Sequence, residues 1–482
     1  MLKHPRHRHW DAIVVGGGPA GSATALLLAR AGASVLLLDR ARFPRHKACS
    51  EYLSPATTPI LERLGVLAAI ERAAHAKLYG MTVVAPSGAA MSGRFASDHD
   101  HAPPRPYSFA VSRAIFDMML LRAAAREGAD VREGTTVEDL VWDRGAVAGV
   151  VVRSSDVGRV TCNARVVVGA DGLHSVVARR LGLVRTSPPR RVAFTAHVAH
   201  VDGVDGMGEL HVSRCGYVGL GPIGEAVTTV ALVVPLAAVR GRTQDFRRDF
   251  FAELERYPRL AGRFERRRLV RDVLATGPFA QWARRPVVDG ALLVGDAADF
   301  FDPFTGQGIY SALRGAELAA DCLVRALERE VLTEAHERGV VTLGPPLPEV
   351  LTPWPPLPSG EGEFMTFPLS GTERGTGGED ETWRETGGGE RTERGSAGEH
   401  PSGSLPVEAL QSYVRARRRE FAGKWALERL IGLGVGWPAL TERVVRRLAR
   451  RPDLADLLVG ATGNFVPARR VLAARFLARL LW

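Results

Sequence analysis

The sequence of 482 residues predicts an α/β fold with an inserted antiparallel sheet and a helical C-terminal region. Three observations lead to this prediction. A buried strand, a glycine-rich turn, a helix and a second strand follow one another at residues 11–40. Two more short apolar strands, residues 165–169 and 291–294, each run straight into a corner made of Asp and Gly. Residues 192–234 are rich in strand-forming residues between turn signals, which is typical of an antiparallel sheet.

The first element of the chain combines a strand, a turn and a helix. Residues 11–15 are mostly apolar and predict a buried strand, and residues 19–31 predict a helix. Between them stands the pattern Gly-x-Gly-x-x-Gly, at Gly16, Gly18 and Gly21. The first glycine allows a tight turn, the second lets backbone N–H groups approach a pyrophosphate, and the third lets helix and strand pack closely. The helix N-terminus then presents unpaired N–H groups and a positive dipole end to a diphosphate.

The second strand, residues 34–38, ends at an acid. Asp39 lies 18 residues after Gly21, close to the ~20 residues at which a carboxylate accepts hydrogen bonds from a ribose. Strand, glycines, helix, strand and acid therefore stand in the order of a dinucleotide site. A plain βαβ unit without a ligand is the alternative.

Composition excludes several functions. The formal net charge is +10, but arginine supplies nearly all the positive charge and the 53 acidic residues are mixed through the chain. We therefore predict no nucleic-acid partner. The four cysteines lie far apart without metal-ligand spacing, which predicts a reducing compartment, a cytoplasmic location and no metal. No signal peptide and no apolar window of ~18 residues is visible, so no transmembrane segment is predicted.

The middle of the chain alternates between helix and strand signals. Helices are predicted over residues 56–73, 113–127, 244–255 and 308–329. Strands are predicted over residues 81–84, 89–95, 131–133, 135–142, 147–153, 159–162, 165–169 and 291–294. A second Gly-x-Gly-x-x-Gly pattern, at Gly219, Gly221 and Gly224, precedes a strand rather than a helix. It predicts a hairpin turn and no phosphate site.

The composition changes near residue 338. Residues 338–405 are rich in Pro, Gly, Glu, Thr and Ser and predict a disordered low-complexity insertion. Helical periodicity resumes at Val407 and continues through residues 406–482, with basic and apolar faces. Two interpretations of this C-terminal region stay open. It forms a helical cap that packs on the core, or it also rests on a membrane surface as a peripheral contact.

Three separated motifs carry a family resemblance: GGGPAG, GADGLHS and LLVGDAADFFDPFTGQGI. Together they resemble the FAD-dependent oxidoreductases that include geranylgeranyl reductases, flavin-dependent halogenases and aromatic-hydroxylase-type monooxygenases. The resemblance covers about residues 9–330 and part of the C-terminal helices. It implies a glutathione-reductase-type Rossmann FAD domain with an inserted antiparallel-sheet substrate domain. We assign residues 9–78, 107–185 and 270–330 to the FAD-binding domain, and residues 79–106 and 186–269 to the substrate domain.

The resemblance also implies cofactor-binding residues around the last motif. Asp296 follows a buried strand, where a carboxylate can accept a hydrogen bond from the ribitol of FAD. Pro303, Gly306 and Gly308 lead into a helix whose bare N–H groups would stabilise negative charge on the reduced flavin. Gly308 and Ile309 resemble the residues that touch the flavin ring.

Further cofactor-binding residues lie in the first half of the chain. Asp171 and Gly172 resemble a fingerprint near the pyrophosphate, Arg113 resembles an arginine that reaches the FAD phosphates, and Val137 resembles a position beside adenine. Each has a plainer alternative, since Asp171 could cap a turn, Arg113 could cover a surface and Val137 could belong to the core. The predicted set is completed by residues around the first turn and after the second strand: Ala20 and Arg40.

Cys49 and Ser50 resemble a reductase pattern in which a Cys-Gly pair passes the flavin. Here Ser50 replaces the glycine, so close approach of the backbone is less assured. Cys49 is either a functional thiol beside the flavin or a buried inert cysteine.

The substrate motifs of the family are incomplete in this sequence. Prenyl reductases carry a Tyr-x-Trp-x-Phe-Pro segment, and residues 217–222 retain only its tyrosine and proline. The resemblance therefore implies an FAD-dependent oxidoreductase that acts on a hydrophobic small molecule, by NAD(P)H-driven monooxygenation or C=C reduction, with NAD(P)H bound transiently. Catalytic residues are not predicted. An electron-transfer flavoprotein dehydrogenase with a protein or quinone partner is the alternative, and a flavin-binding protein without turnover is a third reading.

Overall fold

The computed structural model describes residues 9–95, 100–155, 158–188, 190–239, 246–337 and 403–481. The predicted insertion, residues 338–405, lies outside the described residues except for its last three. Within that remnant, Ser404 and Leu405 are buried, and the backbone N–H of Leu405 donates to the carbonyl of Arg165. These two residues belong to the folded protein, because they pair with the edge of the main sheet.

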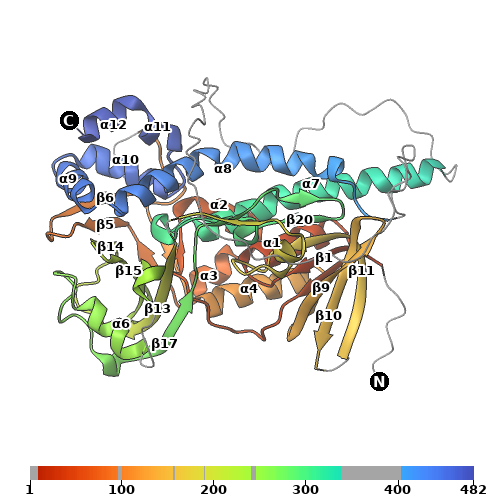
Figure 1. The fold of residues 1–482 in the computed structure, drawn as a ribbon, viewed down its shortest axis with the longest axis horizontal. Helices are drawn as coiled ribbons and strands as arrows, with labels where there is room; N and C mark the ends of the chain where they lie inside the picture. Colours follow the sequence, from red (N-terminus) through yellow and green to blue (C-terminus); the bar gives the residue numbers. More distant parts are fainter. Residues whose placement is uncertain are drawn as a thin grey trace, which may run out of the picture. The chain divides into compact units, whose positions relative to one another are not determined.

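The main sheet is largely parallel and has helices packed beside it (Figure 1). Its strand order is β19 (Val287–Val288), β20 (Ala291–Leu293), β11 (Gly158–Gly169), β1 (Trp10–Val15), β2 (Val35–Leu38) and β8 (Asp130–Arg132). Only β19 runs antiparallel to its neighbour. Ala12 of β1 lies opposite Val166 of β11 and Val35 of β2. Strands β2 and β20, residues 12–15 of β1 and residues 166–168 of β11 are apolar and buried because both faces of the sheet are covered there, as is usual for parallel sheets.

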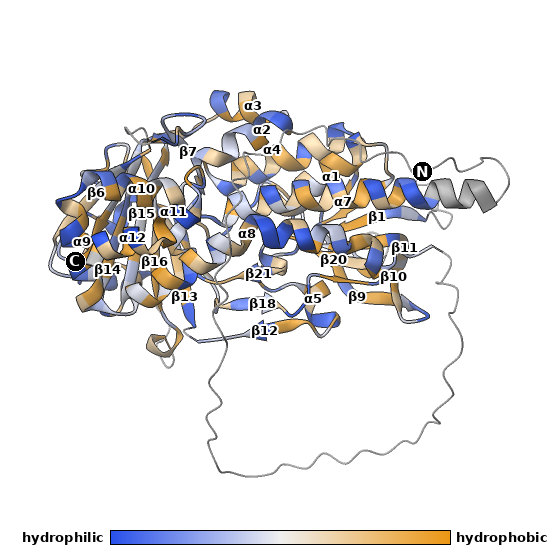
Figure 2. Ribbon diagram, turned by 90° about the horizontal axis from the view of Figure 1, so that it is seen from above, coloured by the Kyte–Doolittle hydropathy of each residue, from blue (hydrophilic) through white to orange (hydrophobic). Residues whose placement is uncertain are grey.

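Helices cover the main sheet. They are α1 (Pro19–Arg30), α4 (Arg113–Arg126) and α7 (Gly308–Glu337), with the short α5 (Val176–Arg180). The apolar residues of α1 and α4 join β1 and β2 in one buried cluster, and Figure 2 colours much of α1 as apolar. The side chain of Ser112 caps the N-terminus of α4 by accepting from the N–H of Ala114, a common helix-start device.

A hairpin extends β11. Strands β9 (Thr135–Asp143) and β10 (Ala146–Ser154) form it, and β10 pairs antiparallel with residues 158–163 of β11. The second half of β11 then pairs parallel with β1. One long strand therefore serves both the hairpin and the parallel sheet.

The second sheet has the order β17 (Leu269–Thr276), β13 (Arg191–Ala199), β16 (Val227–Pro235), β15 (Gly216–Gly224), β14 (Gly208–Ser213), β5 (Gly80–Val84) and β6 (Ala90–Arg94). It is antiparallel as predicted except for the pair β14–β5, which is parallel. Helix α6 (Phe246–Leu254) packs on it through Phe250, Phe251 and Leu254. Strand β17 belongs to this sheet, so the sheet continues to Thr276, seven residues beyond residue 269, where the predicted substrate domain ends.

Small elements connect the two sheets. One three-stranded sheet consists of β3 (Tyr52–Leu53), β7 (Ser108–Ala110) and β4 (Ala76–Leu78), and another of β12 (Val184–Thr186), β18 (Gln281–Ala283) and β21 (Asp299–Phe300). The helix predicted over residues 56–73 is instead two short helices, α2 (Thr58–Arg63) and α3 (Leu67–Arg72). Gly65 separates them with φ +72°, a conformation that favours glycine and ends a helix.

The predicted hairpin turn at Gly219–Gly224 is misplaced. All three glycines lie along strand β15. The turn itself is formed by Glu225 and Ala226, which have φ of 51° and 57°. Two consecutive residues with positive φ match the tight turns that suit the twist of a hairpin.

The C-terminal residues form a helical cap on the second sheet (Figure 1). The helices are α8 (Val407–Val435), α9 (Pro438–Ala449), α10 (Pro452–Thr462), α11 (Ala468–Leu472) and α12 (Ala474–Leu481). Tyr413 and Phe421 of α8 join the core of the first domain, whereas Leu427 joins the cap. A Cβ placed on Gly93 of β6 would lie 2.6 Å from Val459 Cγ2, so α10 packs directly on this strand. Among the described helices, none has the length and apolar composition that crossing a bilayer requires.

Candidate cofactor and substrate site

One cavity of about 750 Å³ lies between the main sheet and the second sheet. The last residues of β1 and β2, Val15 and Leu38, line one end of it. Residues of β13, β15 and β16, among them Thr195, Gly219 and Thr229, line the middle. The carboxyl ends of parallel strands are where ligands bind in open α/β sheets, so the cavity has the expected position of a ligand site.

Sixteen of the seventeen predicted cofactor residues line this cavity. They come from separate parts of the chain: Gly16, Gly18, Ala20, Asp39, Arg40, Cys49, Ser50, Arg113, Val137, Asp171, Gly172, Asp296, Pro303, Gly306, Gly308 and Ile309. Gly21 is the exception, because it lies behind the cavity wall. A Cβ on Gly21 would stand 1.8 Å from the carbonyl oxygen of Gly16. Its absence lets α1 pack against the turn, which is the role that the glycine pattern assigns to it.

The first turn is shaped by contacts between backbones. Gly16 has φ +106°, and a Cβ there would lie 2.5 Å from the carbonyl oxygen of Ala170. The carboxylate of Asp39 accepts hydrogen bonds from the N–H groups of Gly17, at 2.7 Å, and Ala41, at 2.8 Å. Asp39 therefore holds the glycine turn to the end of β2.

Two arginines stand over Gly18. A Cβ built on Gly18 would lie 3.7 Å from Nη2 of Arg45 and 3.9 Å from Nη2 of Arg113. Both guanidinium groups pair with one buried carboxylate, Asp117, at 2.8 Å and 2.6 Å. Nη2 of Arg45 also lies 3.9 Å from the carboxylate of Asp39, so two guanidinium groups and two carboxylates meet beside the glycine turn. Arg113 is buried, which excludes the alternative that it merely covers a surface.

Arg45 was missed in the sequence. It stands in the loop of residues 40–55, where several basic residues follow one another and no periodicity distinguishes any of them. Its position six residues after Asp39 is a signal only once the loop is known to fold back over the glycine turn.

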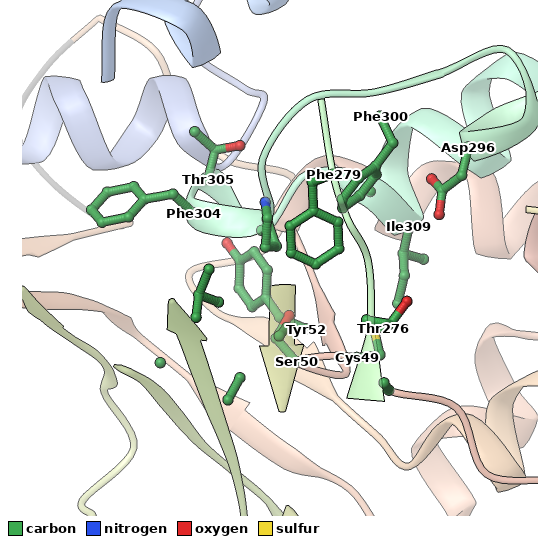
Figure 3. Close-up of a pocket in the computed structure, with 18 of the residues that line it drawn as sticks. Cys49, Ser50, Tyr52, Thr276, Phe279, Asp296, Phe300, Phe304, Thr305 and Ile309 are labelled. Carbon is green, nitrogen blue, oxygen red and sulfur yellow. The ribbon is translucent and has the colours of Figure 1, made fainter. Parts of the chain in front are cut away.

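Asp296 faces the cavity from the short turn after β20. Burial raises its pKa to about 6, although the charges of Arg113 and Lys47 act in the opposite direction. Lys47 also lines the cavity. Figure 3 shows the carboxylate of Asp296 on the same side of the pocket as Ile309.

The turn before α7 forms the next part of the wall. The carboxylate of Asp302 accepts from the N–H of Phe304 at 3.0 Å and so begins the turn of residues 303–305. Gly306 ends it with φ +67°, and a Cβ there would lie 2.9 Å from the ring of Tyr52. Helix α7 then starts at Gly308, so its first N–H groups point away from the helix body toward the cavity end.

Asp171 has two roles in the wall. Its Oδ2 accepts from the N–H of Val176 at 2.6 Å, so it does cap the start of α5, as the plainer alternative had it. Its Oδ1 is buried and has no hydrogen-bond partner among the described residues. Burial raises the pKa of Asp171. Val137 likewise belongs both to a buried cluster and to the cavity wall.

A buried pair that the sequence did not indicate lies behind Cys49. Glu51 Oε2 and His197 Nε2 are 2.7 Å apart and both residues are buried. The N–H of Glu51 donates to the sulfur of Cys49 at 3.3 Å, and the hydroxyl of Thr229 donates to the Cys49 carbonyl at 3.4 Å. These contacts fix the Cys49–Glu51 segment against the second sheet. His197 is 146 residues away from Glu51 in the chain, and nothing local marks the pair.

The far part of the cavity is apolar. Figure 3 shows Phe279, Phe300 and Tyr52 between Asp296 on one side and Phe304 on the other. The rings of Phe279 and Phe300 have centroids 5.1 Å apart. Beyond them the lining consists of aliphatic side chains from the second sheet and the cap, among them Met81, Met91, Leu427, Ile431, Val435, Val444, Leu448, Val459, Phe476 and Leu480.

The comparisons with known proteins agree with this arrangement. The FAD binding domain family matches residues 9–338, more than half of the chain. The chain belongs to the FAD-binding domain family. Its relatives include proteins named as reductases and as a monooxygenase, and a solved structure described as an FAD-dependent halogenase matches it at 27% identity with a TM-score of 0.62. The chain is an FAD-dependent oxidoreductase.

Individual relatives show how far the likeness extends. The chain is 31% identical over 343 residues to conditioned medium factor receptor 1 of Dictyostelium discoideum, over 68% of this chain and 66% of that protein, slightly less than two thirds. It is 31% identical over 330 residues to the menaquinone reductase of Mycolicibacterium smegmatis, over 65% and 76% of the two chains. A geranylgeranyl bacteriochlorophyll reductase-like structure from Thermoplasma acidophilum matches 98% of both chains with a TM-score of 0.68 at 17% identity. This last match shows a shared fold that includes the helical cap.

The residues of this chain fit FAD, the cofactor of the family. The glycine turn and the start of α1 leave N–H groups at the place where the guanidinium groups of Arg45 and Arg113 stand, and these donors suit a diphosphate. Burial and nearby charges, and no hydrogen bond from a described residue, determine the pKa of Asp296, so its carboxylate can accept from a ribitol hydroxyl. The start of α7 presents N–H groups to a developing negative charge.

Proposed function

We propose that this chain uses NAD(P)H to drive monooxygenation or C=C reduction of a hydrophobic small molecule. The observation that carries the proposal is the continuity of the cavity. The same hollow runs from Gly18 and Asp296 to aliphatic side chains of the cap such as Val444 and Leu480. A cofactor at the polar end and an apolar substrate at the other end would meet in the middle, beside Cys49 and Phe300.

In this proposal the polar end of the cavity binds FAD, and the aromatic rings beside it keep the reacting atoms dry. Arg45 and Arg113 would bind the FAD diphosphate, Asp296 would accept from the ribitol, and residues 306–309 would contact the flavin ring. Bound FAD supplies the two-electron chemistry. The rings of Phe279 and Phe300 would exclude water from the reacting atoms, because dry surroundings strengthen electrostatic contacts there and suppress side reactions.

The comparisons support a substrate of this class. Menaquinone reductase and digeranylgeranylglycerophospholipid reductases are named among the relatives at 28–31% identity, and a 6-methylpretetramide 4-monooxygenase at 28%. An electron-transfer flavoprotein dehydrogenase with a protein partner is less favoured, because passing electrons to a protein does not need a long apolar cavity. The proposal includes a cytoplasmic location, in keeping with four free cysteines.

The test follows the flavin spectrum of the purified holoprotein. Under anaerobic conditions, NADPH or NADH should bleach the flavin, and the rate identifies the preferred nicotinamide. Admission of oxygen then separates the two chemistries. Rapid reoxidation with release of hydrogen peroxide in the absence of substrate supports monooxygenation, and slow reoxidation supports C=C reduction. A flavin that neither nucleotide bleaches would contradict the proposal and favour the electron-transfer alternative.

A further inference from the structure

The apolar end of the cavity reaches the surface at the junction of α8 and α9. Leu430 lines the cavity and is at the same time 44% exposed. Leu440 and Val444 of α9 and Leu477 and Leu480 of α12 line the same end and are partly exposed. An opening for an apolar ligand therefore lies beside Leu430.

Exposed large apolar side chains gather at this opening. Leu433 is 68% exposed and Trp437 is 66% exposed, within seven residues of Leu430. Six large hydrophobic residues are exposed in the described part of the chain, and these three are half of them. We call Leu430, Leu433 and Trp437 the α8–α9 rim. Scattered exposed apolar residues are ordinary, but a group beside an opening marks an interaction surface.

Positive charge is concentrated in the same region of the sequence. Residues 406–482 contain fifteen Arg and Lys residues and six Asp and Glu residues, a formal charge of +9 out of +10 for the whole chain. Helix α9 contacts α8, and α12 contacts α9; these two helices carry exposed arginines such as Arg443, Arg446 and Arg475. Together α9 and α12 contain five arginines and one glutamate, so the helices next to the rim are basic.

These observations together point to one kind of partner. We propose that the α8–α9 rim docks on an anionic lipid bilayer, and that a membrane-resident lipid enters the cavity past Leu430 as the substrate. Leucine and tryptophan side chains insert at the boundary between headgroups and acyl chains, and arginines bind the negative surface of an anionic leaflet. The identity of the substrate as a lipid rests on the proposed function, whereas the docking itself does not.

A bilayer explains the rim better than a folded protein partner does. A protein interface of ordinary stability places its aromatic and aliphatic residues at the centre of a shape-complementary patch of charge-depleted surface. Here the apolar residues surround an opening into a long apolar cavity, and the surrounding helices are rich in arginine. Direct transfer from bilayer to cavity also spares an insoluble substrate from crossing water.

The experiment measures binding of the FAD-loaded full chain to vesicles by sedimentation. Vesicles of phosphatidylglycerol and phosphatidylcholine should bind the wild-type protein more tightly than vesicles of phosphatidylcholine alone, and added salt should weaken the difference. The double variant Leu433→Ser, Trp437→Ser should reduce the partition coefficient by about tenfold or more, because two inserted apolar side chains are lost.

Matched controls use exposed apolar residues on other elements. Trp142→Ser on β9, where Trp142 is 51% exposed, and Val270→Ser on β17, where Val270 is 61% exposed, should leave vesicle binding unchanged. An equal loss in these controls, no loss in the rim variant, or no vesicle binding by the wild-type holoprotein would overturn the docking. A concentration-dependent dimer that the rim variant abolishes, without vesicle binding, would also overturn it and assign the rim to contacts between copies.

Flavin content and anaerobic bleaching by NADPH are recorded for every variant. Retained bleaching without vesicle binding contradicts only the docking. Vesicle binding that the rim variant loses, in a protein whose flavin is not bleached, supports the docking and contradicts the proposed function.

Discussion

The hydroxyl of Tyr217 donates a hydrogen bond to Oδ1 of Asp302 at 2.6 Å. Arg191 donates to the other oxygen, Oδ2, also at 2.6 Å. Tyr217 stands on β15 and Arg191 on β13, whereas Asp302 begins the turn that leads into α7. One carboxylate therefore joins the second sheet to the cofactor side of the cavity. Burial, followed by the charge of Asp302, raises the pKa of Tyr217 well above its usual value, so its hydroxyl keeps its proton.

This network predicts two unequal losses of stability. Tyr217→Phe removes one hydrogen bond to a carboxylate that keeps its other donors, and we expect a loss of about 1.5–3 kcal/mol in the free energy of unfolding. Asp302→Ala leaves the buried guanidinium of Arg191 without its partner, and we expect about 3–5 kcal/mol. Urea denaturation of the holoprotein measures both. Tyr79→Phe, at an exposed tyrosine, is the control, with an expected change within about 0.5 kcal/mol. Equal losses of stability in Tyr217→Phe and Asp302→Ala would contradict the role of Asp302 as the shared partner of Tyr217 and Arg191.

Two glycines of the first turn predict different effects of substitution: Gly21 is needed for stability, and Gly18 is needed for FAD binding. Gly21→Ala places a Cβ 1.8 Å from the Gly16 carbonyl oxygen. Only movement of the backbone relieves this clash, so we expect a loss of about 3 kcal/mol or more in stability. Gly18→Ala places its Cβ at ordinary distances from Arg45 and Arg113, so the fold should survive. The new methyl group occupies the space over the turn, and FAD affinity should fall by about tenfold.

Thermal unfolding and the absorbance of bound flavin distinguish the two glycine variants. A stable Gly21→Ala protein with wild-type flavin content would show that the turn is not packed as described. If the Gly18→Ala protein bound FAD with unchanged affinity, the FAD diphosphate would not lie over this turn.

The sequence alone was enough to predict those elements around the main sheet whose signals are local. The strand, turn and helix at residues 10–30 could be predicted because every signal lies within a few residues: apolar β1, three glycines, and Pro19 at the first helical position. The same holds for α4, whose N-cap Ser112 and terminal Gly128 both stand beside it. Short-range signals that agree with one another define such elements.

The strand pairing of the second sheet could not be predicted, because it depends on contacts between residues far apart in the sequence. Strand β5 pairs with β14, and Gly80 and Gly208 are separated by more than a hundred residues. The glycines of β15 resembled a turn because a strand interior seldom contains three of them. These positions are glycine because of contacts in the folded protein rather than because of a local turn. Gly219 and Gly221 line the cavity, where larger side chains would fill space that the ligand needs.

The residues of the candidate site also fall into those that local motifs indicated and those that only the fold brings together. Residues in motifs, such as Asp296, were found, whereas Arg45, the Glu51–His197 pair and the Tyr217–Asp302 contact were not. Asp302 stands only six residues after Asp296, yet its role depends on Tyr217, which is 85 residues distant. A single sequence identifies groups that a local turn presents, and it does not identify partners that only the fold brings together.

A partly buried acid on α8, Glu428, predicts how stability depends on pH. Thr305 donates to Oε1 of Glu428 at 3.3 Å. Burial, then the nearby charge of Asp299, raises the pKa of Glu428 to about 8, although Lys424 acts in the opposite direction. The folded state therefore binds more protons than the unfolded state between about pH 4.5 and 8. Stability from this group should fall as pH rises through that interval, by at most about 1.4 kcal/mol per pH unit.

Glu428→Gln tests this dependence because the amide does not titrate. The wild-type free energy of unfolding should decline more steeply with pH than that of the variant over the same interval. Glu408→Gln on the same helix, at an exposed position, should keep the wild-type slope. A Glu428→Gln curve parallel to the wild-type curve would show that Glu428 is ionised in the folded protein.

Asp296 predicts that FAD binding is coupled to release of a proton. Its pKa is raised to about 6 when no ligand donor reaches it, and a ribitol hydroxyl that donates to the carboxylate favours the charged form. Binding therefore lowers this pKa, and FAD affinity should increase as pH rises from one unit below 6 to one unit above it, by at most about tenfold per unit. Fluorescence quenching during titration of the apoprotein with FAD measures the dissociation constant at each pH.

Two substitutions separate the charge of Asp296 from its hydrogen-bonding role. Asp296→Asn keeps an acceptor oxygen but does not titrate, so FAD should bind more weakly and with little pH dependence. Asp296→Ala also loses the acceptor and should retain the least flavin after purification. Asp143→Asn, at an exposed position at the end of β9, should match the wild-type protein. If the asparagine variant kept the full pH dependence, the coupled proton would belong to another group, and Asp296 would not face the ribitol.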